Sequence, residues 1–245
     1  RHVPYLFGKW HAEETRVPSD FGFRGHDFKG YAHPGCGVWR NFRFNLAPWA
    51  GNRYADWLKE KGIEPPAVTR SFQGENPGCQ DQELYGLLDA PEEASIPWFL
   101  AEETCRAMDE AASESRPFFI WANFWGPHTP CVVPEPYFSM VDPASIPEDP
   151  AFRESFEGKP EIQRIISRMW GLHDSGWDVW REIVARYYGY VIQIDRMVGR
   201  MLAHLEARGA LENTVVIFTA DHGDAMGAHR LIEKGEFMYD ETYRV

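Results

Sequence analysis

The sequence predicts an α/β protein, and two neighbouring segments carry this prediction. Residues 180–208 repeat apolar side chains at helical spacing, which indicates a long amphipathic helix that Gly209 ends. Residues 215–219 (VVIFT) then form an apolar, β-branched run, which is typical of a strand buried on both faces. A helix, a tight turn and a buried strand in this order indicate an α/β fold with right-handed crossovers.

Further regular elements are expected along the rest of the chain. Residues 93–115 predict an amphipathic helix, with Ser95 as a candidate cap and Pro97 in its first turn. Residues 117–124 (PFFIWANF) predict a second buried strand. The other expected elements are a strand over 1–11, short helices over 54–61 and 161–170, and a short helix with the start of a strand over 235–245.

Two ranges contain many turn residues and little periodicity. Residues 12–90 are rich in glycine, proline and aromatic side chains, and residues 131–179 are loop-rich apart from the helix expected over 161–170. No internal repeat or low-complexity segment separates either range from its surroundings. We therefore interpret both as insertions over a site rather than as domains of their own.

The composition argues against some classes of function. The net charge of -12 disfavours a nucleic-acid partner, because phosphate backbones attract basic surfaces. No stretch is long and apolar enough to span a membrane. The cysteines are widely spaced and form no CxxC pair, so they indicate neither a zinc knuckle nor a dense disulfide framework. Their spacing is still compatible with one or two disulfide bonds. The cysteines are Cys36, Cys79, Cys105 and Cys131.

Side chains that can do chemistry follow each expected strand. Asp221 and His222 come directly after the VVIFT run, and His128 follows the PFFIWANF strand between two prolines. Lys9 and His11 lie where the first strand runs into a loop. Because ligands bind at the carboxyl ends of strands in open α/β sheets, we expect these residues near one another. Taken singly, each has a structural alternative as a cap, a turn histidine or an exposed charge.

Together with Lys234, these residues suit the metal-assisted transfer of a phosphoryl or sulfuryl group. Asp221 and His222 can hold a divalent cation, although two ligands are too few for a complete site. Lys9 and Lys234 can neutralise a tetrahedral oxyanion. His11 and His128 can move protons near neutral pH.

Several motifs in the same order resemble those of one enzyme family. They are GKWH at 8–11, PHTP at 127–130 and TADHGD at 219–224, the last followed by Gly227, His229, Leu231 and Lys234–Gly235. With these motifs, and with matching residues at 188–200 and 239–245, the chain resembles a sulfatase of the alkaline phosphatase superfamily. The resemblance implies an alkaline phosphatase-like, mostly parallel sheet flanked by helices and incomplete at both ends. It also implies that 1–245 is a partial sulfatase catalytic domain.

The resemblance implies a role for each matched residue. Asp221 and His222 would be two ligands of a divalent cation, usually Ca²⁺, with Mn²⁺ or Mg²⁺ as alternatives. Lys9 would contact the nucleophile and the sulfate, and His11 would be the base that collapses the sulfated intermediate.

Three further residues follow from the same resemblance. His128 and Lys234 would bind the sulfate and assist the leaving alcohol. His229 would line the pocket and contact the substrate, with an ordinary loop histidine as the alternative. Asp224 would support the metal ligands from behind, or would simply be a turn acid.

The sequence departs from the family at the nucleophile. The family's nucleophile is a formylglycine, made from a cysteine or serine in a C/S-x-P/A-x-R motif, and this chain has no such motif. The family's two other metal-binding aspartates also have no counterpart here. We therefore expect an upstream segment to supply these groups, and we expect residues 1–245 alone to be inactive.

The leading hypothesis is the hydrolysis of a sulfate ester of a carbohydrate or of a small aryl or alkyl alcohol. A phosphonate monoester or phosphodiester hydrolase is the close alternative, because such relatives share the Asp-His-Gly motif, the histidines and the nucleophile. A two-zinc alkaline phosphatase is less favoured, since it needs more His and Asp ligands than the chain offers. A non-catalytic binding protein on the same fold is the alternative from another class.

Overall fold

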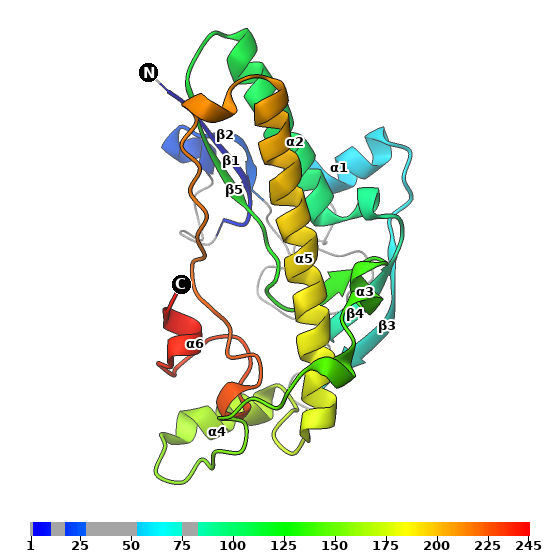
Figure 1. Ribbon diagram of the computed structural model, residues 1–245, viewed down its shortest axis with the longest axis vertical. Coiled ribbons are helices and arrows are strands. Elements are labelled where there is room, and N and C mark those ends of the chain that lie inside the picture. Colours follow the sequence, from blue (N-terminus) through cyan, green and yellow to red (C-terminus); the bar gives the residue numbers. More distant parts are fainter. Residues whose placement is uncertain (1, 11–17, 28–52, 75–82) are drawn as a thin grey trace.

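The computed structural model describes residues 2–10, 18–27, 53–74 and 83–245, and these form helices around two three-stranded sheets (Figure 1). The strands are β1 (Val3–Gly8), β2 (Arg24–Asp27), β3 (Ala67–Gln73), β4 (Glu83–Asp89), β5 (Phe118–Asn123) and β6 (Cys131–Val133). The helices are α1 (Arg53–Glu60), α2 (Ile96–Ser113), α3 (Tyr137–Met140), α4 (Glu161–Met169), α5 (Trp177–Ala207) and α6 (Asp240–Tyr243). The predicted α/β class is confirmed.

The first sheet has the order β2-β1-β5 and is parallel throughout. Its central strand, β1, is almost wholly buried, as an apolar strand covered on both faces should be. β5 alternates instead, and Phe119 and Trp121 are 51% and 49% exposed. The strands predicted over 1–11 and 117–124 are therefore present, but the second of them is only partly buried, and on one face.

The second sheet has the order β3-β4-β6, with β3 antiparallel to β4 and β4 parallel to β6. β2, β3 and β4 lie inside 12–90, so the prediction of loops there misses these three strands. β3 exposes most of its side chains, which removes the apolar alternation on which strand prediction depends. Strand β6 and helix α3 are likewise missed in the range 131–179, where only α4 is predicted.

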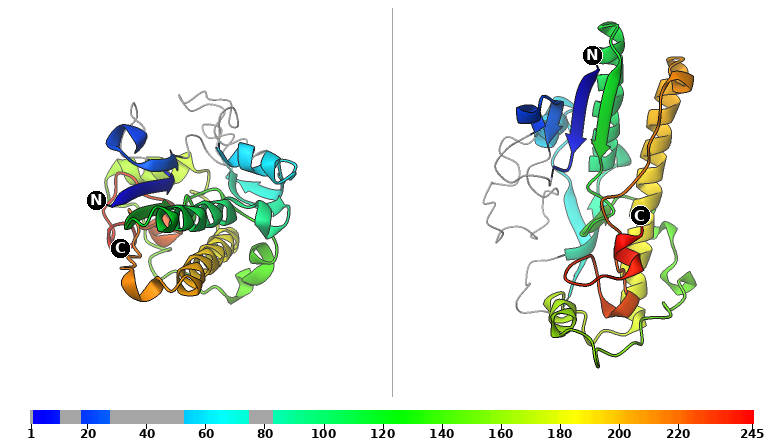
Figure 2. Two further views of the ribbon diagram at one scale, coloured as in Figure 1. Left: turned by 90° about the horizontal axis from the view of Figure 1, so that it is seen from above. Right: turned by 90° about the vertical axis from the view of Figure 1, so that its left-hand side faces the viewer.

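The two long helices form layers behind the first sheet. Figure 2 shows α2 between the β2-β1-β5 sheet and α5. α2 packs on β1 and β5 with one side and on α5 with the other, which explains why its buried residues occupy more than one face. α5 ends just before Gly209, whose φ of +63° suits glycine at a helix C-terminus. The helices predicted over 54–61, 93–115, 161–170 and 180–208 are confirmed as α1, α2, α4 and α5.

The run 215–219 does not form the buried strand that its sequence predicts. It is extended but not part of a sheet, and Val215, Ile217 and Phe218 are 88%, 80% and 81% exposed. In the described part of the chain, 215–218 make no backbone hydrogen bond. A strand needs a partner at its edge, and an apolar run cannot show by itself that a partner is present. The prediction of burial here is wrong for this structure.

Three smaller findings complete the fold. The thiols of Cys105 and Cys131 are free, whereas Cys36 and Cys79 lie outside the described residues. Among the described helices, none combines the length and the apolar character that a membrane crossing requires. The short helix expected near the end of the sequence is α6.

Replacing Ser95 by alanine is expected to lower the free energy of unfolding by about 1–2 kcal/mol. Its Oγ accepts hydrogen bonds from the Trp98 backbone N at 3.4 Å and from Gln193 Nε2 at 2.9 Å, so it both caps α2 and links α2 to α5. Urea unfolding would measure the change. Ser113→Ala, at the exposed end of the same helix, is the control, and equal losses in both variants would contradict the cap.

Candidate functional site

Lys9 and His128 reach one edge of the first sheet because β1 and β5 are parallel neighbours. Gly8 pairs with Asn123 in their register, and the Lys9 backbone N donates to the Asn123 carbonyl at 3.1 Å. Asn123 Nδ2 returns a hydrogen bond to the Lys9 carbonyl at 3.0 Å. Gly8 has a φ of +97°, and a Cβ there would lie 1.9 Å from the Asn123 carbonyl oxygen. Glycine is thus required where β1 turns into the site.

Asp221 lies opposite Lys9, although the two are far apart in the sequence. Lys9 Nζ is 3.4 Å from Asp221 Oδ2, and it lies over the Trp125 ring at 4.9 Å from its centroid. The Lys9 side chain is 10% exposed and that of Asp221 is 65% exposed. An almost buried cation therefore faces a carboxylate that is still open to solvent. Such a carboxylate can bind a further cation.

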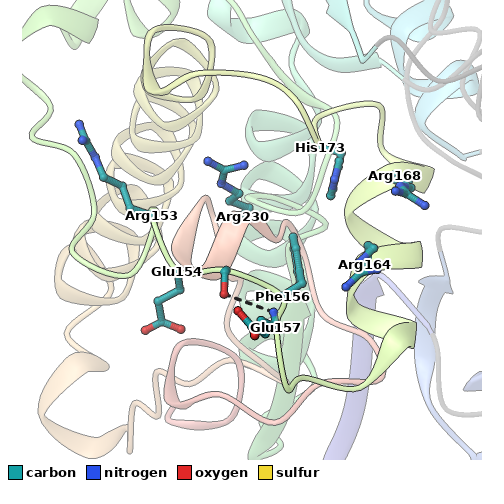
Figure 3. Close-up of a pocket in the computed structure, with 9 residues that line it drawn as sticks. Arg153, Glu154, Phe156, Glu157, Arg164, Arg168, His173 and Arg230 are labelled. Carbon is teal, nitrogen blue, oxygen red and sulfur yellow. Dashed lines mark hydrogen bonds between the residues drawn. The ribbon is translucent and has the colours of Figure 1, made fainter.

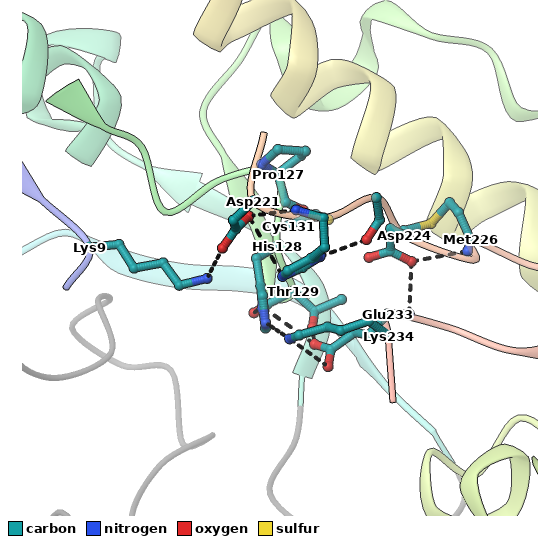
Figure 4. A network of polar contacts seen from close by, with 12 residues as sticks. Lys9, Pro127, His128, Thr129, Cys131, Asp221, Asp224, Met226, Glu233 and Lys234 are labelled. Carbon is teal, nitrogen blue, oxygen red and sulfur yellow. Dashed lines mark hydrogen bonds and ion pairs between the residues drawn. The ribbon is translucent and has the colours of Figure 1, made fainter. Parts of the chain in front are cut away.

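His128 forms the centre of the site (Figure 4). Lys234 Nζ lies 2.6 Å from its Nε2, and its Nδ1 lies 2.8 Å from the Thr129 carbonyl. These contacts assign the proton to Nδ1, which donates to the carbonyl while Nε2 accepts from Lys234. Glu233 supports the arrangement, because its carboxylate accepts from Thr129 Oγ1 and lies 3.4 Å from His128 Nδ1.

The geometry of His222 and Asp221 fits two ligands of one metal ion. His222 Nδ1 donates to the Gly223 carbonyl at 2.7 Å, which leaves the lone pair on Nε2. That Nε2 is buried and has no hydrogen-bond partner in the described part of the chain. It lies 3.7 Å from Asp221 Oδ1, a gap that one ion can bridge with bonds of about 2.0–2.6 Å. A backbone hydrogen bond on the other ring nitrogen is typical of a metal-binding histidine.

These two ligands do not complete a metal site. Within the ranges that the structure describes, no group of three or more His, Cys, Asp or Glu side chains is placed to hold an ion. The sequence prediction of two ligands therefore fits the local geometry, and any others must come from elsewhere.

The charges nearest His128 are two lysines and two carboxylates: Lys9 pairs with Asp221, and Lys234 lies 3.7 Å from Glu233. Burial lowers the pKa of His128 to about 3, and the charges of Lys234 and Lys9 add to this effect. Burial opposes the ionisation of Asp221, but Lys9 and His222 outweigh it and hold the pKa of that carboxyl below its usual range. His128 is therefore neutral at neutral pH in the free protein, and its predicted role in moving protons stays a prediction. An anion bound between the lysines would reverse part of this shift.

The loop 223–234 positions Lys234 and is held by Asp224. Asp224 Oδ1 accepts from the backbone N of Met226 at 3.0 Å and of Glu233 at 2.7 Å, so the turn-acid interpretation is the one that its contacts support. Burial and the nearby Glu233 raise the pKa of Asp224 to about 6. Positive φ angles recur at non-glycine residues in this loop, which is typical of backbone held under strain near a site. They are found at Met226, His229, Arg230 and Glu233.

The structure brings most of the predicted site residues together. The cluster contains Lys9, His128, Asp221, His222 and Lys234. His229 contacts other residues: its ring stacks on Tyr239 at 3.6 Å, and its Nδ1 lies 2.9 Å from Glu154 Oε2. These contacts assign it a structural role in holding the loop, and its predicted contact with substrate stays a prediction. His11 lies outside the described residues.

Sequence reasoning missed three members of the site. They are Glu233, Thr129 and Trp125, which lie close to predicted site residues in the sequence. A glutamate, a threonine or a tryptophan in a loop does not by itself indicate a functional site. Adjacency to Lys234 and His128 is the one signal that could have indicated them. Glu233 is buried, and this burial raises the pKa of its carboxyl group.

Comparison with known proteins identifies the family. The sulfatase family model matches residues 52–245, which is most of the chain. The chain belongs to the sulfatase family. An arylsulfatase of Clostridium perfringens is 34% identical over 139 residues, which cover 54% of this chain and 27% of that protein. A multifunctional alkaline phosphatase superfamily protein of Trinickia caryophylli is 27% identical over 212 residues, covering 78% of this chain and 40% of that protein. The sulfatase chain thus spans less than half of either relative.

A solved structure gives the same fold. The phosphonate monoester hydrolase of Agrobacterium radiobacter superposes with a TM-score of 0.67 and 22% identity, over 99% of this chain and 49% of that one. The likeness confirms the alkaline phosphatase-like α/β fold expected for this sulfatase-family chain, without bearing on its substrate.

Proposed function

We propose that the protein hydrolyses sulfate esters with the help of a divalent cation. One observation carries the proposal: Lys9, His128 and Lys234 converge beside Asp221 and His222. Such a set suits a tetrahedral oxyanion whose negative charge grows during the reaction. The arylsulfatase similarity supports sulfate as the group transferred.

Each residue has a defined task in the proposed reaction. Lys9 and Lys234 bind the sulfate oxygens and stabilise the charge that develops on them. His128, oriented by its Nδ1 hydrogen bond to Thr129, presents Nε2 towards Lys234 and the leaving oxygen, and its pKa rises once the anion is bound. Asp221 and His222 would hold the cation, which polarises the sulfate oxygen when bound.

The nucleophile is also part of the proposal. The proposed nucleophile is a formylglycine, which is made from a cysteine or serine in a C/S-x-P/A-x-R motif. Residues 1–245 do not contain this motif. Mass spectrometry of the product of the complete reading frame would detect this modification. The proposed cation is Ca²⁺, for which Asp221 offers a carboxylate ligand, with Mn²⁺ or Mg²⁺ as alternatives.

Removing divalent cations from the complete product is expected to abolish its hydrolytic activity, and adding Ca²⁺ back should restore it. Asp221→Asn should need a higher Ca²⁺ concentration for half-maximal activity, because an amide oxygen attracts the ion less than a carboxylate does. Initial rates after EDTA treatment and metal titration would measure both effects. Full activity in metal-free buffer would contradict the proposed ligands.

A substrate comparison tests the type of ester. We expect the highest kcat/KM on a sulfate monoester, measured with p-nitrophenyl sulfate and a sulfated monosaccharide against a phosphonate monoester and a phosphodiester. The alternative, phosphonate or phosphodiester hydrolysis, is kept for this test, because the similarity to the arylsulfatase covers only 54% of this chain. A preference for the phosphorus esters would replace the proposed function, and no activity on any of them would favour a binding protein.

A further inference from the structure

A second concentration of positive charge surrounds a hollow beside α4. The hollow has a volume of about 540 Å³. Its lining includes four arginines from three segments of the chain, together with His173 and Phe156. The arginines are Arg153, Arg164, Arg168 and Arg230. In Figure 3 the side chains of Arg164, Arg168 and Arg230 lie around the ring of Phe156, whereas Arg153 points away from that ring. Four arginines at one hollow are unusual in a chain whose net charge is -12.

The positive charge of the hollow is only partly compensated. Arg153 pairs with Glu148, with 3.1 Å between Nη2 and Oε2, and Arg164 pairs with Glu161 at 3.3 Å. Arg168 has no carboxylate within ion-pair distance in the part of the chain that the structure describes. Arg164 and Arg168 also lie one helical turn apart on α4, where like charges repel.

Arg230 is likewise without a carboxylate partner among the described residues. Its Nε donates to the Phe152 carbonyl at 3.2 Å, and its guanidinium lies 5.4 Å from the centroid of the Phe152 ring. These contacts fix the stem of Arg230 and leave the outer nitrogen atoms of the guanidinium for another acceptor.

The acidic residues at the hollow do not neutralise the arginines. Glu154 lies 2.6 Å from Lys159 Nζ and 2.9 Å from His229 Nδ1, so its carboxylate is already engaged. Figure 3 shows this carboxylate pointing away from the guanidinium groups of Arg153 and Arg230. Glu157 alone cannot balance the two unpaired guanidinium groups.

We propose that this hollow binds a small organic polyanion that carries sulfate or phosphate groups. Guanidinium forks match the geometry of tetrahedral oxyanions and bind them through two parallel hydrogen bonds. The volume is within the range of small-molecule sites. Phe156 and His173 stack with 5.6 Å between ring centroids, which gives the hollow a flat wall against which a sugar ring can lie.

This anion site is separate in its residues from the candidate catalytic site. None of its lining residues belongs to the set Lys9, His128, Asp221, His222 and Lys234. The two share only the loop 223–234, which carries Arg230 to the hollow and Lys234 to the cluster. The proposal therefore does not rest on the hydrolytic function.

Calorimetric titration with sucrose octasulfate, a polysulfated sugar, tests the proposal in the full chain. We expect saturable binding that weakens as salt is raised, because the contacts are between charges. The double variant Arg164→Gln/Arg168→Gln should raise Kd about tenfold or more. The matched control is Lys59→Gln/Arg116→Gln, which also removes two positive charges, one of them from an ion pair of 3.3 Å. Thermal unfolding checks that each variant is folded.

Two comparisons separate this site from the catalytic cluster and from a site for small ions. Lys9→Ala should bind sucrose octasulfate as the unmodified chain does; loss of binding in this variant, with binding retained in Arg164→Gln/Arg168→Gln, would overturn the proposal. An equal effect of both double variants, or no binding at all, would also overturn it. Inorganic sulfate should bind far more weakly, and equal affinity for it would show that the hollow takes a simple ion instead of a polyanion.

Discussion

Lys9→Ala is expected to lower kcat/KM on the preferred ester by about 10²–10³-fold, the usual cost of removing one group that stabilises a developing oxyanion. The Lys9 side chain is almost buried and lies between Asp221 and the Trp125 ring, so its ammonium group is held in one position. The measurement is steady-state kinetics on the product of the complete reading frame. Most of the loss should be in kcat, because the charge is needed in the transition state.

The control for this prediction is Lys59→Ala, which removes an exposed lysine from α1. It should change kcat/KM less than twofold, since distant surface charges are screened. Lys9→Arg should recover only part of the activity, because a planar guanidinium does not reproduce a point charge at this position. If Lys9→Ala retained activity within a factor of about five, Lys9 would have no role in charge stabilisation.

Trp180→Ala is expected to lower the free energy of unfolding by about 3–5 kcal/mol, a large share of the total stability of an ordinary domain. The Trp180 side chain is fully buried in the cluster that joins α5 to β4 and to the loop 223–234. It contacts the Phe152 ring at 6.1 Å between centroids. Alanine would leave a cavity that the surrounding elements cannot fill. Urea denaturation would give the loss.

Trp121→Ala is the matched control, because it removes the same side chain from the half-exposed face of β5. Its loss of stability should be clearly smaller, since a solvent-exposed ring leaves no closed cavity. Equal losses in the two variants would mean that the packing around Trp180 is not what stabilises this region. Since Ile232 lies in the same cluster, Trp180→Ala should also loosen the segment that positions Lys234.

Sequence analysis correctly predicted the two long helices and the convergence of the site residues, because both depend on rules that local sequence patterns reveal. Helical periodicity is a local property, so α2 and α5 follow from their own apolar spacing. The convergence of Lys9 and His128 follows from the rule that parallel strands end at one edge of a sheet.

The features that sequence analysis missed depend on partners far away in the chain. The run 215–219 has the composition of a buried strand, but only a neighbouring strand could bury it, and its composition cannot reveal whether one is there. The site role of Glu233 depends on Thr129 and His128, which are brought to it by the fold. The charge-dependent fall in the pKa of His128 arises in the same way, from burial and from two lysines that are distant in the sequence.

The exposed run at 215–218 has a consequence for how the chain behaves in solution. Its backbone makes no hydrogen bond within the described residues, and its side chains are β-branched or aromatic. Segments of this kind act as templates for intermolecular β-sheets and, at high concentration, for ordered aggregates. A strand added to this segment would also set the position of Asp221 and His222, which follow it directly. The solubility of the chain and the geometry of the two candidate metal ligands are therefore coupled through one short stretch of backbone.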